Sequence, residues 1–168
     1  RAKWCYYRVR KKVRSGMSVI VWDGKTLAAD RYAEMCGAKG IAEKLFLLPT
    51  NEVVGFTGAL STGMEMLALY RVGRLVTHWP EAQRSDDWAR LIVGKSDGSV
   101  VYYERSPAEI PTYATHIAWG SGQDFALTAL HMNADAVKAV AVTSRLCSTC
   151  GGGVTAFEYH EGFWRKVT

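Results

Sequence analysis

The sequence predicts an α+β domain in which strands and helices form separate layers. The predicted elements follow the order strands, helix, strands, two helices and a strand, whereas a parallel α/β sheet needs regular alternation of strands and helices. Turn residues between apolar runs indicate antiparallel hairpins. The 168 residues are 48% hydrophobic and 22% charged, which is typical of a globular protein. We expect one domain at residues 17–168, preceded by a short leader.

The leader, residues 1–16, differs in charge from the rest of the chain. It carries seven Lys and Arg residues and no acidic residue, so the 21 basic residues of the whole chain leave 14 against 16 acidic residues in the domain. The domain therefore has a net charge of −2, although the whole chain has +5. Because the basic excess belongs to the leader, it does not predict a nucleic-acid-binding domain.

Three interpretations of the leader are open. The first is upstream sequence translated in frame, because Arg14-Ser15-Gly16 before Met17 suits purine-rich, ribosome-binding-site-like codons. The second is a propeptide removed by self-cleavage, although Met17 then separates the cut from the hydroxyl residue Ser18. The third is a basic arm for an acidic partner or nucleic acid, with aromatic rings among the cations. In the third interpretation Ser18 is internal.

Apolar and cysteine content predict a soluble, cytoplasmic protein. No apolar run approaches the roughly 20 residues that a membrane-spanning helix needs, and the leader lacks the apolar stretch of a secretory signal. The four cysteines, Cys5, Cys36, Cys147 and Cys150, are therefore expected as reduced thiols and not as a disulfide framework.

Two hairpins are predicted at the start of the domain. The β-branched run 18–22 is closed by Asp23-Gly24 and followed by a second strand at 26–30. The apolar segments 44–48 and 53–57 lie on either side of a Pro-Thr-Asn turn and form the second hairpin.

The period of the apolar residues then changes. Residues 61–73 show helical spacing, and 79–88 are expected to be loop and the start of a helix. The apolar segment 88–93 fits a strand or a short helix equally well. The turn Ser96-Asp97-Gly98-Ser99 predicts a third hairpin, which residues 100–103 leave as a strand.

Two helices and one strand are predicted in the C-terminal part. Residues 124–131 and 134–144 show helical spacing. The segment 147–153, rich in Cys and Gly, has the composition of a sharp turn, and residues 154–159 form the last predicted strand.

Four motifs in this chain, in this order and at similar spacing, resemble those of proteasome β-subunits. They are Leu27-Ala28-Ala29-Asp30-Arg31, Glu43-Lys44-Leu45-Phe46, Val54-Gly55-Phe56-Thr57-Gly58 and Gly120-Ser121-Gly122. The bacterial ATP-dependent relative and short phage or bacterial proteasome-like proteins share this pattern. The resemblance covers residues 17–159.

The resemblance implies an N-terminal-nucleophile (Ntn) hydrolase, with a four-layer αββα sandwich of two antiparallel sheets. Ser18 takes the place of the usual nucleophilic Thr. Asp30 matches the carboxylate that ends the first hairpin, and Lys44 the lysine that opens the next strand. Gly58 matches the glycine whose N–H lines the oxyanion hole, and Ser121 matches a serine of the site.

Elementary chemistry supports the same roles. A primary hydroxyl needs a base, and an α-amino group with a pKa of about 7.7 to 8.0 is partly neutral at working pH. A buried Lys44 ammonium lowers that pKa further, and Asp30 holds Lys44 charged and oriented. The Gly58 N–H binds the oxyanion, where one donor contributes roughly 3 kcal/mol. Ser121 holds the terminal amine or relays its proton.

Each of these residues also has an ordinary interpretation when taken alone. Asp30 is then a solvated charge at a strand end, Lys44 half of a weak surface ion pair, and Ser121 part of a turn that caps a helix. Only the combination predicts a catalytic site.

The chain departs from the family in three respects. The nucleophile is Ser18, which lacks the methyl group that restrains a Thr rotamer. The first hairpin is a few residues shorter. Cys147 and Cys150 occupy the places where the family typically has an Asp and a Ser that support the terminal amine, and a thiol accepts hydrogen bonds poorly.

No cofactor or metal is predicted. A single Cys-x-x-Cys supplies two of the four ligands of a zinc site, so His131 or His160 would have to complete it. Redox exchange needs the pair at a helix N-terminus, whereas here it precedes three glycines. Buried thiols in a turn are the expected outcome.

The predicted function is hydrolysis of peptide or amide bonds through a Ser18 acyl-enzyme. The expected partners are peptides or unfolded proteins as substrates, further copies of the chain in a ring, and an ATPase. One alternative is an inactive structural or assembly subunit of the same fold, and another is an Ntn amidase acting on a small molecule. A nucleic-acid-binding protein that uses the basic arm predicts salt-sensitive binding that disappears when residues 1–16 are deleted.

Overall fold

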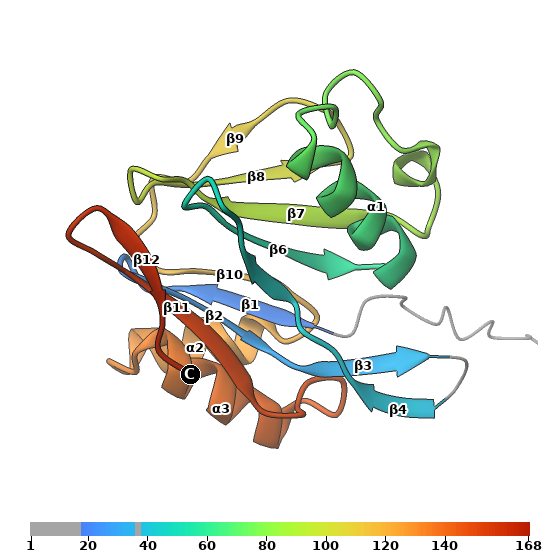
Figure 1. Ribbon diagram of the computed structural model, residues 1–168. Coiled ribbons are helices and arrows are strands. Elements are labelled where there is room, and N and C mark those ends of the chain that lie inside the picture. Colours follow the sequence, from blue (N-terminus) through green and yellow to red (C-terminus); the bar gives the residue numbers. More distant parts are fainter. Residues whose placement is uncertain (1–17, 36–37) are drawn as a thin grey trace, which may run out of the picture.

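A computed structural model describes residues 18–35 and 38–168 (Figure 1). Two five-stranded antiparallel sheets stack face to face, with one helix outside one sheet and two helices outside the other. This arrangement confirms the four-layer αββα sandwich. The leader and Met17 lie outside the described residues, so the interpretations of the leader remain predictions.

The first sheet carries the start of the domain. Its strand order is β10-β1-β2-β11-β12, and helices α2 and α3 pack on its outer face. The bounds are β1 (Val19–Trp22), β2 (Thr26–Asp30), β10 (Ile117–Gly120), β11 (Val154–His160), β12 (Phe163–Lys166), α2 (Gln123–His131) and α3 (Ala136–Leu146). Because β1 lies between β10 and β2, neighbouring strands enclose the start of β1 on both sides.

The second sheet has the sequential order β5-β6-β7-β8-β9 and is covered by helix α1. The bounds are β5 (Leu45–Leu47), β6 (Val53–Gly58), β7 (Ala89–Gly94), β8 (Val100–Glu104), β9 (Ile110–Pro111) and α1 (Leu60–Arg71), with a short 3-10 helix at Glu81–Arg84. Short connections join β5 to β6, β7 to β8 and β8 to β9, whereas α1 and the 3-10 helix lie in the longer connection between β6 and β7.

A two-stranded sheet links the two larger ones. Strands β3 (Tyr32–Met35) and β4 (Ala38–Ile41) pair with each other and connect β2 to β5 (Figure 1). The sequence did not predict this hairpin, because the side chains of β4 are exposed or half-buried and show no apolar alternation. Its position matters because it carries the chain from Asp30 to Lys44.

Strands at the centre of the sandwich are buried on both faces. In β1, Val19 and Val21 pack toward α2 and α3, while Ile20 and Trp22 pack toward the second sheet. Burying each such side chain contributes about 1.5–3 kcal/mol. A strand covered on both faces reads as a continuous apolar run, which explains why residues 88–93, now seen as strand β7, fitted a helix equally well.

The structure confirms the three predicted hairpins and the three predicted helices, with shifts at their ends. Strand β1 begins at Val19 and not at Ser18, and α3 begins after Asp135, whose side chain caps it. Strand β12 was missed because Phe163–Lys166 has two apolar residues followed by two charged ones and resembles a tail. It pairs with β11 across a tight turn. In the described part of the chain, no helix is long and apolar enough to cross a membrane.

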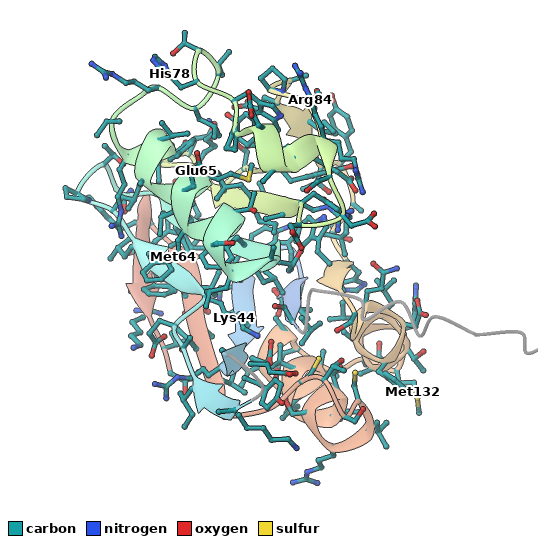
Figure 2. All side chains as sticks on the ribbon, turned by 90° about the vertical axis from the view of Figure 1, so that its right-hand side faces the viewer. Lys44, Met64, Glu65, His78, Arg84 and Met132 are labelled. Carbon is teal, nitrogen blue, oxygen red and sulfur yellow. The ribbon has the colours of Figure 1, made fainter. Side chains whose placement is uncertain are left out.

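Gly63 allows α1 to approach the second sheet closely, since a Cβ at this position would overlap the ring of Phe56 on β6. We expect Gly63→Val to lower the free energy of unfolding by about 1–3 kcal/mol, because the added carbons force the helix and the sheet apart. Denaturant titration measures this loss. Met64→Val, on an exposed position of the same helix (Figure 2), is the control for the cost of β-branching. Equal losses in the two variants would contradict the packing explanation.

Candidate active site

Ser18 lies at the entrance to β1 and is almost completely buried, with 4% of its surface exposed. The neighbouring strand β10 ends at Gly120, whose φ of +101° favours glycine. A Cβ on Gly120 would collide with the Ser18 carbonyl oxygen. The glycine therefore allows β10 and the following turn to approach Ser18 closely.

A buried ion pair lies beside this entrance. Lys44 Nζ donates to Asp30 Oδ1 at 2.7 Å, and the side chains are 5% and 0% exposed. Asp30 ends β2, the central strand of the first sheet, and Lys44 immediately precedes β5, an edge strand of the second, so the pair links the two stacked sheets. Charges this deeply buried persist only when they are paired and hydrogen-bonded.

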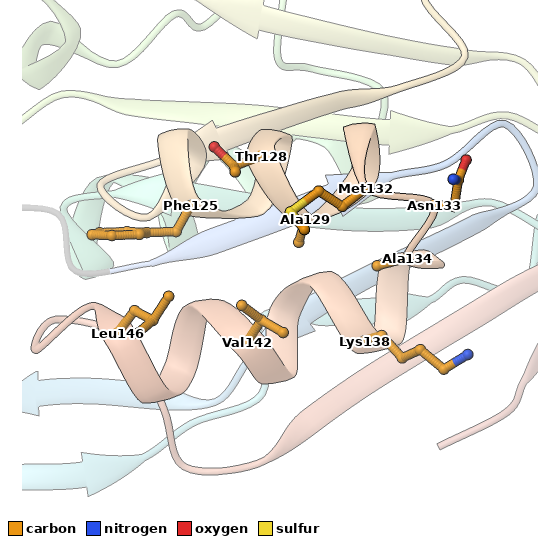
Figure 3. A pocket seen from close by; sticks show the side chains of 9 residues that line it. All are labelled: Phe125, Thr128, Ala129, Met132, Asn133, Ala134, Lys138, Val142 and Leu146. Carbon is orange, nitrogen blue, oxygen red and sulfur yellow. The ribbon is translucent and has the colours of Figure 1, made fainter.

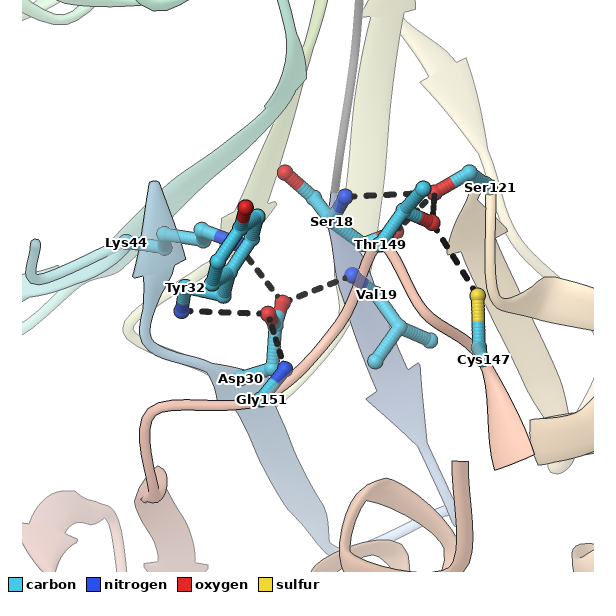
Figure 4. A network of polar contacts seen from close by, with 9 residues as sticks. All are labelled: Ser18, Val19, Asp30, Tyr32, Lys44, Ser121, Cys147, Thr149 and Gly151. Carbon is cyan, nitrogen blue, oxygen red and sulfur yellow. Dashed lines mark hydrogen bonds and ion pairs between the residues drawn. The ribbon is translucent and has the colours of Figure 1, made fainter. Parts of the chain in front are cut away.

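Three backbone N–H groups complete the shell of Asp30. Val19 N donates to Oδ1 at 2.8 Å, and the N–H groups of Tyr32 and Gly151 donate to Oδ2 at 3.2 and 3.0 Å (Figure 4). The donors come from β1, β3 and the turn before β11, and Val19 directly follows Ser18. Asp30 thereby fixes the position of the nucleophile candidate through its neighbour in the chain.

Lys44 is poised to lose its proton more easily than an ordinary lysine. Burial lowers the pKa of Lys44, and the charge and hydrogen bond of Asp30 offset this effect only in part. Burial disfavours the charged form of a lysine, whereas a paired carboxylate favours it. Lys44 thus combines a positive charge beside Ser18 with a perturbed pKa, which is a frequent property of active-site residues.

Ser121 holds the other side of Ser18. The Ser18 backbone N–H donates to Ser121 Oγ at 3.3 Å. Ser121 Oγ lies 2.9 Å from Thr149 Oγ1, which in turn lies 3.0 Å from Cys147 Sγ. Figure 4 shows Ser18 between this chain of contacts and the Lys44–Asp30 pair.

Thr149 is the functional candidate that sequence reasoning missed. Cys147 was expected to leave the support of the terminal nitrogen incomplete, but the hydroxyl of Thr149 lies within hydrogen-bond distance of Ser121 in the structure. Thr149 is 28 residues from Ser121 in the chain, so their contact could not be predicted from the sequence. The one indication in the sequence was that Thr149 carries a hydroxyl two residues after Cys147, the position where the family has an Asp.

Gly58 ends β6 next to the same entrance. Its φ is +106°, and a Cβ would lie 2.5 Å from the Trp88 carbonyl oxygen, so glycine is required here. The preceding residue, Thr57, has its methyl group 3.3 Å from the position of a Cβ on Gly120, the position that also abuts Ser18. The fold therefore brings the end of β6 to Ser18, and all five predicted site residues lie around the start of β1.

The two thiols of the 147–150 turn differ in environment. Cys147 is half-buried and Cys150 is buried. Burial opposes ionisation of Cys147, but hydrogen bonds from Thr149 and Cys150 outweigh it and lower the pKa of Cys147. Burial, followed by the Asp30 charge, raises the pKa of Cys150 to about 12.

We therefore expect iodoacetamide to alkylate Cys147 at least about tenfold faster than Cys150 in the folded protein at pH 8, because the thiolate is the nucleophile. Tandem mass spectrometry of the tryptic peptide 146–165, which contains both cysteines, distinguishes the two sites. The same reaction in denaturant is the control, and there the rates should become similar. Faster labelling of Cys150 in the folded chain would contradict the assignment.

A separate cavity of about 500 Å³ lies between α2 and α3 (Figure 3). Its lining is mostly apolar, including Phe125, Met132 and Leu146, and Lys138 is its one charged residue. Because this lining is mostly apolar, the region around Ser18 is the candidate active site. Within residues 18–35 and 38–168, no three His, Cys, Asp or Glu side chains are grouped to hold a metal ion.

The fold is that of the proteasome-like Ntn hydrolases. HslV from Trypanosoma brucei is similar over 84% of this chain and 99% of its own, with a TM-score of 0.61 and 20% identity. Thiobacillus denitrificans BPH in complex with epoxomicin is similar over 90% of this chain and 99% of its own, with a TM-score of 0.63 and 16% identity. BPH alone has a TM-score of 0.61 and 18% identity, over 90% of this chain and 98% of its own. Neither a family model nor a curated protein sequence matches this chain.

Proposed function

We propose that this protein is an Ntn peptidase that cleaves peptide bonds with Ser18 as its nucleophile, after the residues before Ser18 have been removed. The observation that carries the proposal is the convergence on one buried serine of a lysine–carboxylate pair and a hydroxyl aligned with the serine nitrogen. A surface serine at a strand end has no need of these partners.

In the proposed mechanism the free amine of Ser18 takes the proton of its own hydroxyl as Oγ attacks the scissile carbonyl carbon. Ser121 orients the amine, and the Lys44 charge favours the neutral amine and the developing alkoxide. The oxyanion of the tetrahedral intermediate is stabilised by the Gly58 N–H. The amine then protonates the leaving nitrogen, and water attacks the acyl-enzyme to restore Ser18.

The substrate and partners follow from the fold-level likeness and from the sequence motifs. We propose peptides or unfolded protein segments as substrates, copies of this chain as ring partners and an ATPase as a further partner. Localisation in the cytoplasm is part of the same proposal.

The test compares two purified forms of the domain. One begins at Ser18, released by a site-specific protease, and the other retains Met17 before Ser18, as intact mass spectrometry verifies. We expect only the first form to hydrolyse a fluorogenic peptide amide and to carry an acyl group on its N-terminal peptide after acid quenching. A peptide nitrogen cannot act as a base, because its lone pair is delocalised into the carbonyl.

The outcomes discriminate between the candidate functions. Equal activity in both forms would refute the N-terminal mechanism. A folded but inactive chain that begins at Ser18 would favour the structural subunit. A chain that hydrolyses small amides but not peptides would favour the amidase.

A further inference from the structure

The turn between α3 and β11 contains two thiols and touches both sides of the candidate site. Thr149, between the two cysteines, contacts Ser121 at 2.9 Å. Gly151, directly after the second cysteine, donates its N–H to Asp30 at 3.0 Å. The proposed mechanism uses neither cysteine, so the presence of both thiols in this turn is unexplained by it.

The geometry of the turn suits a disulfide. The N–H of Cys150 donates to the carbonyl of Cys147 at 3.1 Å, which closes a four-residue turn and keeps the two Cα atoms within about 7 Å. Disulfides span Cα separations of about 4.4–6.8 Å. The side chain of Cys150 also contributes to the lowered pKa of Cys147, which is consistent with two neighbouring thiols in this turn.

The two cysteines also differ in the way that sequential oxidation requires. Cys147 is half-buried, and its lowered pKa makes it the thiol that reacts first. Cys150 is buried, so its expected reaction is with the neighbouring Cys147 sulfur and not with an oxidant in solution. The pair follows the C-terminal end of α3, so it lacks the helix N-terminus that strengthens thiolate formation in dithiol oxidoreductases.

We propose that Cys147 and Cys150 form a reversible disulfide that releases Thr149 and Gly151 from the Ser18 site. The loss of hydrolysis that we attach to it rests on the proposed function, whereas the disulfide and its structural effect do not.

The proposed oxidant is a low-molecular-weight disulfide of the glutathione class. The Cys147 thiolate attacks one of its sulfur atoms, forms a mixed disulfide and releases one thiolate. Cys150 loses its proton and attacks the Cys147 sulfur, which forms the internal disulfide and releases the second thiolate. Two protein thiols are thus oxidised, and one disulfide is reduced to two thiols.

The structural consequence follows from the position of Cys147. Its Sγ lies 3.0 Å from Thr149 Oγ1 in the reduced protein, and bond formation draws this sulfur to about 2.05 Å from that of Cys150. Thr149 then loses one of its two partners within a turn whose backbone is newly constrained. Both the Ser121 contact and the Gly151 hydrogen bond depend on the conformation of this turn.

The experiment uses the form of the protein that begins at Ser18, with Cys36 replaced by Ser, which leaves the pair as its only thiols. The protein is treated with glutathione disulfide, quenched with iodoacetamide and digested with trypsin. We expect peptide 146–165 to lose two hydrogens and to carry no alkyl group, and dithiothreitol to reverse the change. In Cys150→Ser we expect a stable glutathione adduct on Cys147, because the second thiol is missing.

Two readouts measure the effect on the site. Hydrogen exchange of the amides of Val19 and Gly151, both bonded to Asp30, should accelerate at least about tenfold on oxidation. Peptide hydrolysis by the same sample should fall at least about tenfold. Cys147→Ser, treated identically, should keep both values equal to those of its own untreated sample.

The outcomes separate the two proposals. A persistent glutathione adduct in the intact pair, or no reaction at all, would overturn the disulfide. A disulfide that leaves both amides equally protected would overturn its coupling to the site. Formation of the disulfide with accelerated exchange, in a sample that shows no hydrolysis even when reduced, would support this inference and count against the proposed function.

Discussion

Asp30→Asn is expected to lower the free energy of unfolding by about 3–5 kcal/mol, because it removes one partner of a fully buried ion pair. Asp30 has no exposed surface and accepts from Lys44 and from three backbone N–H groups. An asparagine loses the charge and must also turn an NH₂ group toward some of these donors. Urea titration at neutral pH measures the change.

Two variants make this prediction specific. Asp135→Asn is the matched control, because Asp135 caps α3 with a half-exposed side chain and asparagine caps equally well. The double variant Asp30→Asn, Lys44→Met removes both charges and should recover at least about 1 kcal/mol relative to the sum of the single changes. Similar losses for Asp30→Asn and Asp135→Asn would show that the buried pair does not stabilise the fold.

Ser18→Ala, in a chain that begins at residue 18, is expected to reduce peptide hydrolysis at least about 10³-fold and to abolish the acyl-enzyme. The physical reason is that, in the proposed mechanism, the Ser18 hydroxyl supplies the attacking electron pair. The fold should survive, since the change removes one small hydroxyl from a strand end. Steady-state kinetics and acid-quench mass spectrometry measure the two effects, and circular dichroism checks the fold.

Ser148→Ala is the control for this variant. Ser148 is exposed in the turn beside Thr149, so it tests whether loss of any nearby serine hydroxyl matters. Its activity should remain within about twofold of the parent chain. Residual turnover of Ser18→Ala at a similar level would place the nucleophile elsewhere.

The predicted hairpins and helices depend on local chemistry, which explains why they could be predicted. Asp23-Gly24 closes the first hairpin because Gly24 has a φ of +94° and the Asp23 carboxylate accepts hydrogen bonds from the backbone N–H groups of Lys25 and Thr26. Gly98 plays the same role in the third hairpin, with a φ of +84°. Such turns form from the properties of a few adjacent residues.

Elements whose stability depends on distant partners were predicted poorly. Strand β4 has no buried side, and β7 is buried on both sides by elements from other parts of the chain. Neither strand therefore shows in the sequence the alternation of apolar and polar residues that identifies a strand. The site shows the same division, because motifs suggested Asp30 and Lys44, whereas Thr149 became a candidate only when the fold placed it beside Ser121.

The sequence by itself determined the class of fold, the main turns and the five candidate site residues, because periodicity, turn chemistry and ordered motifs are written in short segments. Only the tertiary structure decided that Asp30 and Lys44 form a pair without exposed surface on the carboxylate, and that Thr149 completes the support of Ser121. The physical reason is that burial and hydrogen-bond geometry arise from the stacking of two sheets, which brings together residues far apart in the chain.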